Sequence, residues 1–111
     1  MKRQRWYISG AVSSDPDYRA KFAYAEFQLK KRGLRVLNPV KHEKEGKKWS
    51  YYLRKDIRKL TKCQGIILLD DWVNSEGARL ELAIAQGLGL DVMMFACITG
   101  WLQSMFQGAD K

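Results

Sequence analysis

The most constraining feature of the sequence is the uninterrupted apolar run Gly65–Leu69 (GIILL), which ends in two acids, Asp70 and Asp71. A strand with one face in water alternates polar and apolar residues, and this run does not alternate. Strands buried on both faces are typical of parallel sheets covered by helices on both sides. The run therefore predicts an α/β fold, provided that helical segments flank it.

Helical and strand-like segments do alternate along the rest of the chain. Further strands are expected over residues 5–9, 34–37 and 91–98, and helices over 15–32, 49–61 and 75–88. Alternating strands and helices predict a doubly wound parallel sheet, of the flavodoxin-like or Rossmann-like kind, with helices on both faces. We expect four strands in the order 2-1-3-4.

Local signals mark where these helices begin and end. Asp15 followed by Pro16 is a favourable helix start, and Ser50 is a plausible N-cap of the second helix. Gly33 stops the first helix, and Gly87 with Gly89 brackets the end of the third.

The length of 111 residues fits one domain over residues 1–111. A tail over 99–111 carries apolar residues at helical spacing, from Trp101 to Phe106, and would pack on its own sheet or against a second subunit. We expect a homodimer. No apolar run is long enough to span a membrane, and the N-terminus lacks the pattern of a signal peptide. Cys63 and Cys97 both have apolar neighbours and are interpreted as reduced core thiols of a cytoplasmic protein.

The net charge of +8 is unevenly placed, because residues 1–62 hold 18 lysines and arginines against 6 acids. This basic half would attract a polyanion or a phosphate-bearing ligand, or would simply form a solvated surface. The solvated surface is favoured, because most of these residues fall on outer helix faces. The lone His42 is interpreted as a solvated loop residue, and no metal site or cofactor is expected.

Glu81 is the first candidate functional residue. At about 100° per residue, the polar residues of its helix gather on one side, and Glu81 falls roughly opposite them. The polar side consists of Glu76, Arg79, Ala83 and Gln86. An inward carboxylate is costly unless it is paired, so such acids are candidate catalytic groups. The alternative is a structural acid, paired with an arginine or half-exposed.

Asp56 is a second acid that points inward. It lies on the apolar stripe of its helix, near Leu53 and Leu60, and away from the basic face that carries Arg54 and Arg58. A structural pair with Lys59 is the alternative, and helical spacing alone does not separate the two.

The expected topology places these acids near the ligand position of the fold. If the strand order is 2-1-3-4, the winding reverses between the first and third strands, and ligands bind at the carboxyl ends of strands near such a reversal. Ser9-Gly10 and Asp70-Asp71-Trp72 follow those two strands. Ser75 and Gly77 begin the next helix, where free N–H groups suit a phosphate or carboxylate. Trp72 would stack on a base or cap the core.

Several of these residues form short motifs in a familiar order. Tyr7-Ile8-Ser9-Gly10, Asp56, Asp70 and Ser75-x-Gly77-x-x-x-Glu81-Leu82 together resemble the nucleoside 2-deoxyribosyltransferase-like superfamily. The motif W-x-x-Y-x-x-x-D-I over residues 49–57 is similar to that of a small branch carried by phage and bacterial genomes. The resemblance covers roughly residues 5–95.

The resemblance implies a role for each matched residue. Glu81 would be the nucleophile at C1′ of the sugar, and Tyr7 would orient it by a hydrogen bond. Asp56 and Asp70 would contact sugar and base, with Asp71 an equal candidate for the latter role. Ser75 and Gly77 would take the 5′-hydroxyl or 5′-phosphate. This agrees with retaining glycoside chemistry, in which a carboxylate captures an oxocarbenium-like centre.

Three functions are compatible with these features. The first is an N-glycosidase or 2-deoxyribosyltransferase acting on a nucleoside or nucleoside monophosphate. The second is a non-catalytic protein that binds a nucleotide or nucleotide-derived signal in the same pocket. The third is a basic nucleic-acid-binding protein, which is disfavoured because the inward acids Glu81 and Asp56 would repel phosphate backbones from the cleft. Any nucleic-acid binding is expected to be weak and non-specific, because no reader motif is present.

Overall fold

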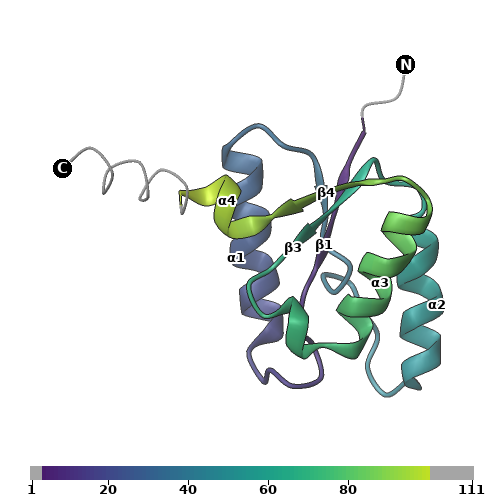
Figure 1. The fold of residues 1–111 in the computed structure, drawn as a ribbon. Helices are drawn as coiled ribbons and strands as arrows, with labels where there is room; N and C mark the ends of the chain where they lie inside the picture. Colours follow the sequence, from purple (N-terminus) through teal and green to yellow (C-terminus); the bar gives the residue numbers. More distant parts are fainter. Residues whose placement is uncertain (1–3, 101–111) are drawn as a thin grey trace.

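The computed structural model describes residues 4–100 and contains a central sheet with helices on both faces (Figure 1). In chain order, the elements are β1 (Trp6–Ser9), α1 (Tyr18–Lys31), β2 (Val36–Leu37), α2 (Trp49–Leu60), β3 (Gly65–Leu68), the 3₁₀ turn η1 (Trp72–Asn74), α3 (Glu76–Gly87), β4 (Asp91–Met94) and α4 (Phe95–Thr99).

The sheet has the predicted topology. All strand pairs are parallel, and the order is β2-β1-β3-β4. The central pair, β1 and β3, is in register from Trp6 opposite Gly65 to Ser9 opposite Leu68. The winding therefore reverses between β1 and β3, which fixes where a ligand site is expected.

Two helices cover each face of the sheet. In Figure 1, α1 and α4 lie on one side of the strands and α2 and α3 on the other. Each side has its own apolar cluster: Phe22 and Leu29 of α1 belong to one, and Leu60 of α2 with Ala85 of α3 belongs to the other. The continuous apolar pattern of β3 follows directly, because Ile67 faces the first cluster and Ile66 the second.

The alternation of β1 separates structural from functional side chains. Trp6 and Ile8 pack into the cluster beneath α1, whereas Tyr7 and Ser9 point to the face covered by α2 and α3. Two hydroxyl groups from one strand therefore reach the same layer as Glu81.

The predicted start of the first helix and the predicted N-cap of the second are wrong. α1 begins at Tyr18 rather than at Asp15-Pro16, because the Asp15 carboxylate accepts the Asp17 N–H at 2.9 Å and pairs with Lys21, which forms a turn before the helix. In α2, Lys48 occupies the N-cap position, and Ser50 already lies within the helix.

The expected fourth strand over 91–98 is too long. β4 pairs with β3 only, and the last pair joins Leu68 to Met94. Because β3 offers no partner beyond Leu68, the chain leaves the sheet and forms α4, whose Phe95 and Ile98 pack against the cluster beneath α1. Cys63 is buried as expected, but Cys97 lies on α4 and is exposed, so its interpretation as a core thiol is wrong.

Two further expectations concern the surface. The polar side of α3 is confirmed, since Glu76, Arg79, Ala83 and Gln86 are exposed. Across residues 4–100, no helix is long and apolar enough to cross a membrane. The apolar tail from Trp101 to Phe106 lies outside the described residues, and the expected dimer remains a prediction.

Candidate active site

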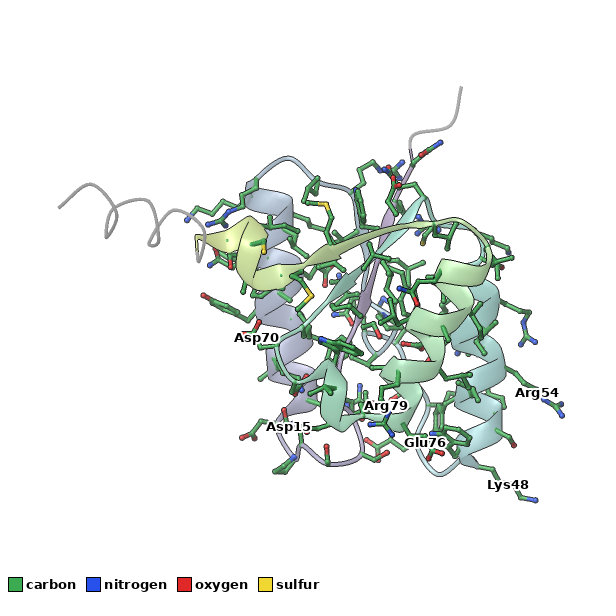
Figure 2. The ribbon with its side chains drawn as sticks, in the orientation of Figure 1. Asp15, Lys48, Arg54, Asp70, Glu76 and Arg79 are labelled. Carbon is green, nitrogen blue, oxygen red and sulfur yellow. The ribbon has the colours of Figure 1, made fainter. Side chains whose placement is uncertain are left out.

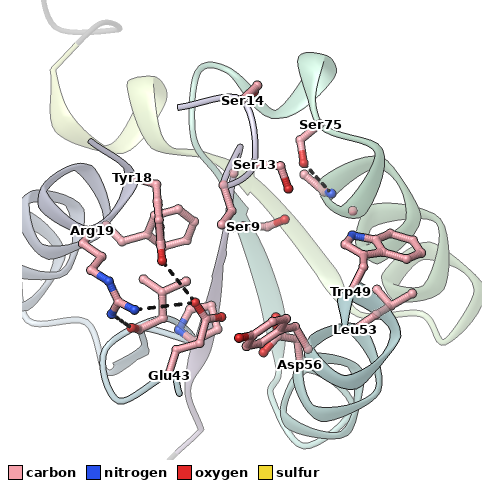
Figure 3. Close-up of a pocket in the computed structure, with 18 of the residues that line it drawn as sticks. Ser9, Ser13, Ser14, Tyr18, Arg19, Glu43, Trp49, Leu53, Asp56 and Ser75 are labelled. Carbon is pink, nitrogen blue, oxygen red and sulfur yellow. Dashed lines mark hydrogen bonds and ion pairs between the residues drawn. The ribbon is translucent and has the colours of Figure 1, made fainter. Parts of the chain in front are cut away.

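A cavity of about 1010 Å³ opens at the carboxyl end of β1. Four segments enclose it: the loop between β1 and α1, the loop over residues 38–48, one face of α2, and the start of α3. Figure 3 shows Tyr18, Arg19 and Glu43 on one wall and Trp49, Leu53 and Asp56 on the other. The cavity adjoins the reversal of the strand order, and its size suits a small organic ligand.

Glu81 is the buried acid of this cavity. It lies on the inner stripe of α3 with Ala78 and Ala85, and its exposed fraction is 7 %. The Tyr7 hydroxyl donates a hydrogen bond to its Oε2 at 2.7 Å, and the Ser9 hydroxyl donates one to its Oε1 at 2.7 Å. Among residues 4–100 no cation forms an ion pair with Glu81. Hydroxyl groups, and not an arginine, therefore satisfy this carboxylate.

Burial controls the protonation of Glu81 and Tyr7. It raises the pKa of Glu81 from 4.5 to about 7, although the hydrogen bonds from Ser9 and Tyr7 act in the opposite direction. Burial, followed by the negative charges of Glu81 and Asp56, raises the pKa of Tyr7 well above its ordinary value. Tyr7 therefore stays a donor, and Glu81 is poised between its two forms near neutral pH.

Asp56 lies across the cavity on α2 and is partly buried (Figure 3). Burial, and then the charge of Glu81, raise its pKa from 3.8 to about 7. The charge of Lys59 lowers it, but no ion pair joins Lys59 to Asp56 within the described part of the chain. Because the repulsion is mutual, ionisation of one carboxyl group disfavours ionisation of the other.

Most of the predicted site residues come together in this cavity. Its lining contains Tyr7, Ser9, Gly10, Asp56, Ser75, Gly77 and Glu81. Three others do not line it: Asp70 is exposed, Asp71 points toward the loop after β1, and Trp72 packs against the apolar cluster under α2 and α3. Of the two interpretations of Trp72, contact with the core is the observed one.

Asp71 fastens the loop that forms one wall of the cavity. Its Oδ1 accepts the backbone N–H of Ala11 at 3.1 Å, and its Oδ2 accepts from the Lys21 ammonium. Lys21 also donates to the Ala11 carbonyl oxygen at 2.8 Å and pairs with Asp15 at 2.8 Å. Both backbone groups of Ala11 are thus held by one ion pair, two residues after Ser9.

Comparison with protein families shows the family to which this domain belongs. Residues 4–94 match the family model described as a domain of unknown function, DUF4406. The chain belongs to this family. A comparison with curated protein sequences gave no match to the DUF4406 chain.

Among solved structures, the DUF4406 domain is similar to a TIR-domain chain from the activated Roq1 resistosome, which directly recognises the pathogen effector XopQ. The TM-score is 0.54 at 15 % sequence identity. The match covers 83 % of this chain but only 56 % of the TIR-domain chain. This similarity shows a shared fold alone.

Sequence reasoning missed several residues of the cavity. Trp49 and Tyr52 precede the predicted Asp56 by seven and four residues, so the three share one face of α2. This spacing could have identified the two aromatic residues. Tyr18, Arg19 and Glu43 had no such signal, because they meet only in the fold. The Tyr18 hydroxyl donates to Glu43 at 3.3 Å, and Arg19 donates to the Val40 carbonyl at 2.9 Å, so the loop over 38–48 is tied to α1.

The ion pair around Ala11 leads to a stability prediction. In the Lys21→Met variant the Asp15 and Asp71 carboxylates lose their shared cation, and the Ala11 carbonyl loses its donor. We expect the free energy of unfolding to fall by about 1–2 kcal/mol, since the partners are only partly buried. Denaturant unfolding measures it.

Lys30→Met is the matched control, because Lys30 is exposed on α1 and its partner Glu26, at 2.8 Å, keeps Lys41 as a second cation in the variant. The Lys30→Met substitution should lower the free energy of unfolding by no more than about 0.5 kcal/mol. Equal losses in the two variants would show that the contacts of Lys21 are no stronger than an ordinary surface pair.

Among residues 4–100, no three side chains of histidine, cysteine, aspartate or glutamate converge in a way that would hold a metal ion. The described side chains that line the cavity include six carboxyl groups, of which Glu81 is buried and Asp56 partly buried, together with several hydroxyl groups and aromatic rings.

Proposed function

We propose that this DUF4406 domain cleaves the N-glycosidic bond of a nucleoside or nucleoside monophosphate, including the deoxy forms, with Glu81 as nucleophile. The observation that carries the proposal is the buried Glu81 carboxylate, which faces a cavity of small-molecule size and is held by one hydroxyl on each oxygen. The resemblance of the sequence motifs to the nucleoside 2-deoxyribosyltransferase-like superfamily supports the same assignment.

The reaction follows from the position of the carboxylate. One Glu81 oxygen attacks C1′ as the C1′–N bond breaks, and the electron pair of that bond leaves with the base, which takes up a proton. The resulting glycosyl ester is then attacked at C1′ by water, giving hydrolysis, or by a second base, giving transfer. Either acceptor restores the carboxylate. Tyr7 and Ser9 fix its orientation, and their hydrogen bonds favour the ionised form that attacks.

Asp56 complements this nucleophile. With a pKa of about 7, it is protonated in part of the molecules at neutral pH. It can then donate to a sugar hydroxyl or to the departing base, while its ionised form can accept a hydrogen bond from the sugar. A pair of carboxyl groups in which one is ionised and the other protonated is the arrangement that glycosidic cleavage requires.

The start of α3 supplies a place for the 5′ end of the ligand. Ser75 caps the helix, and its Oγ accepts the Ala78 N–H at 3.1 Å, which leaves its hydroxyl hydrogen free to donate. The first N–H groups of a helix have no partner within the helix and suit a phosphate. Because Ser75, Gly77 and Glu81 lie on one helix and line one cavity, the 5′ group would lie one turn away from the nucleophile.

A non-catalytic binding protein is the second candidate. The observation that favours it is the low exposure of Glu81, because an acid that is 7 % exposed and already hydrogen-bonded can serve as a fixed acceptor for a ligand. The same residues would then recognise a nucleotide without breaking it.

One experiment separates the two functions. The protein is incubated with a panel of ribonucleosides, deoxynucleosides and their 5′-monophosphates, with and without a second free base, and the products are resolved by chromatography. Release of free base indicates hydrolysis, and a new nucleoside indicates transfer. Binding in the same panel without any product would replace the enzymatic proposal with the binding protein, and neither binding nor product would overturn both.

Asp56→Asn gives a further test of the site. It should lower kcat/KM for base release about 10–100-fold and weaken ligand binding, since a hydrogen bond to the sugar is lost. In the wild type, kcat/KM should rise with pH toward about 7 as Glu81 loses its proton, and fall above it as Asp56 loses the proton that it donates. In the variant the fall should be absent, because asparagine has no such proton to lose.

Asp91→Asn is the control for this variant, because Asp91 is exposed on β4 and does not line the cavity. It should leave both the rate and its pH profile unchanged. If the Asp56→Asn variant had the kcat/KM of the wild type, Asp56 would have no role in the proposed reaction.

A further inference from the structure

The outer face of α2 carries a groove of about 400 Å³, which we call the α2 groove. Six residues line it: Lys47, Lys48, Ser50, Tyr51, Arg54 and Arg58. Figure 2 shows Lys48 and Arg54 projecting from α2 into solvent, away from the sheet. None of these residues contacts the Glu81 carboxylate, so the reaction proposed for the cavity leaves the groove unexplained.

The α2 groove is purely cationic. Four of its six residues are lysine or arginine, and none is acidic. Several other cations of the described chain, such as Arg19, Lys21 and Lys30, are paired with nearby acids. By contrast, none of the four groove cations forms an ion pair within residues 4–100. Their charges are therefore available to an anion from solution.

An aromatic side chain lies among these cations. The Tyr51 side chain is 37 % exposed, and the Lys47 ammonium lies 5.6 Å from the centroid of its ring. Trp49, which is 50 % exposed, follows Lys48 and lines the neighbouring cavity. Exposed aromatic rings beside a row of cations are the features by which proteins bind unpaired nucleotides, through stacking and phosphate contacts together.

The cations of the α2 groove extend over a greater length than a single phosphate group would contact. From Lys48 to Arg58 a helix rises about 15 Å, whereas neighbouring phosphates of a stacked strand are about 3.4 Å apart along its axis. The row therefore matches several consecutive phosphates.

We propose that the α2 groove binds the phosphate backbone of a single-stranded nucleic acid, without recognition of its sequence. A single strand is favoured over a duplex because Tyr51 and Trp49 can stack only on unpaired bases. A strand is also favoured over an acidic protein, because the groove meets the cavity at Lys47, which lines both, and the cavity is suited to one nucleotide.

This binding requires no turnover. The preference for a strand over an acidic protein rests on the function proposed for the cavity. A protein that releases no base would still bind the strand, and an active glycosidase could fail to bind it, so the two experiments distinguish the failure of one proposal from the failure of the other.

The test measures how salt weakens binding. Fluorescence anisotropy with a labelled single-stranded deoxyoligonucleotide of about 12 nucleotides follows the affinity. If the four groove cations each displace a counterion, affinity should fall about 50-fold between about 50 and 200 mM salt. In a variant with Lys48→Gln, Arg54→Gln and Arg58→Gln, affinity should already be lower at low salt, and the same change of salt should reduce it only about threefold.

A matched variant controls for net charge. Lys30→Gln, Lys31→Gln and Arg32→Gln remove the same charge at the end of α1, away from the groove, and should leave the salt dependence as in the wild type. Glutamine has a helix propensity close to those of lysine and arginine, and circular dichroism verifies that both variants fold. Equal effects of the two variants would overturn the proposal, because net charge and not the groove would then determine binding.

The aromatic contribution has its own pair of variants. Tyr51→Leu should weaken binding about fivefold or more, as expected for a lost stacking contact. Tyr24→Leu, on an α1 tyrosine that is 60 % exposed, should have no effect. The proposal would be overturned by an absence of binding at low salt, or by equally effective competition from a duplex, polyglutamate or anionic lipid vesicles.

Discussion

Glu81→Gln is expected to reduce base release by several orders of magnitude while ligand affinity is nearly retained. Glutamine has the shape of glutamate and can still accept a hydrogen bond from Tyr7 or Ser9, so the cavity keeps its form. It cannot form the glycosyl ester, and loss of a covalent step costs far more than loss of a contact. Single-turnover release of base and equilibrium binding, measured on the same preparation, give the two quantities.

Two further variants make this test specific. Asp91→Asn changes an exposed acid that does not line the cavity and should leave turnover unchanged. Glu81→Ala opens space beside C1′, and formate added in excess should restore part of the base release by acting in place of the carboxylate. A Glu81→Gln variant that is destabilised but fully active would show that Glu81 serves the fold and is not the nucleophile.

The inward position of Glu81 followed from the sequence because helical periodicity is a local property. The exposed residues Glu76, Arg79 and Gln86 fixed the outer side of α3, and Glu81 had to lie opposite them. The cover of the sheet by helices on both faces followed similarly from the apolar run of β3. The strand order 2-1-3-4, which the structure confirms, was expected from the right-handed crossovers of doubly wound sheets. None of these inferences needed knowledge of distant contacts.

The contacts that shape the cavity wall could not be obtained in this way. Asp70 and Asp71 are adjacent in the sequence, and nothing local distinguishes them. Only the fold shows that Asp71 forms hydrogen bonds with Ala11 and Lys21, which belong to two other segments. The loop containing Glu43 is joined to α1 by Tyr18 across 25 positions of sequence. Such contacts depend on tertiary placement, for which neither residue type nor spacing provides a local signal.

The termination of β4 illustrates the same limit. The residues after Met94 are apolar and would continue a strand on propensity alone. Their conformation is decided by the length of β3, which ends at Leu68 and leaves no backbone partner for a longer β4. An edge strand therefore takes its length from its neighbour, and Cys97 is carried to the surface on α4 as a result.

The pH dependence of stability provides the second large expected effect, and it requires no substrate. Burial raises the pKa of Glu81 from 4.5 to about 7 in the folded state. Between these two pH values the folded protein keeps a proton that the unfolded chain releases, so the free energy of unfolding decreases as pH rises. The decrease begins near pH 4.5, is complete above pH 7, and amounts to about 3 kcal/mol from this residue. The raised pKa of Asp56 also makes the free energy of unfolding decrease as pH rises. Its contribution is smaller than that of Glu81, because Asp56 is partly exposed and solvent screens its charge.

Glu81→Gln should remove this dependence on pH. At pH 5 the variant and the wild type should be almost equally stable, because both side chains are neutral there. At pH 8 the variant should be more stable by up to about 3 kcal/mol, which for a domain of this size raises Tm by roughly 10–20 °C. Thermal unfolding from pH 5 to pH 8 measures the stability of the variant and of the wild type. A Glu76→Gln control should show the same pH dependence as the wild type. A variant less stable than the wild type at pH 8 would mean that the ionised carboxylate stabilises the fold, which would contradict an acid held at a cost for its chemistry.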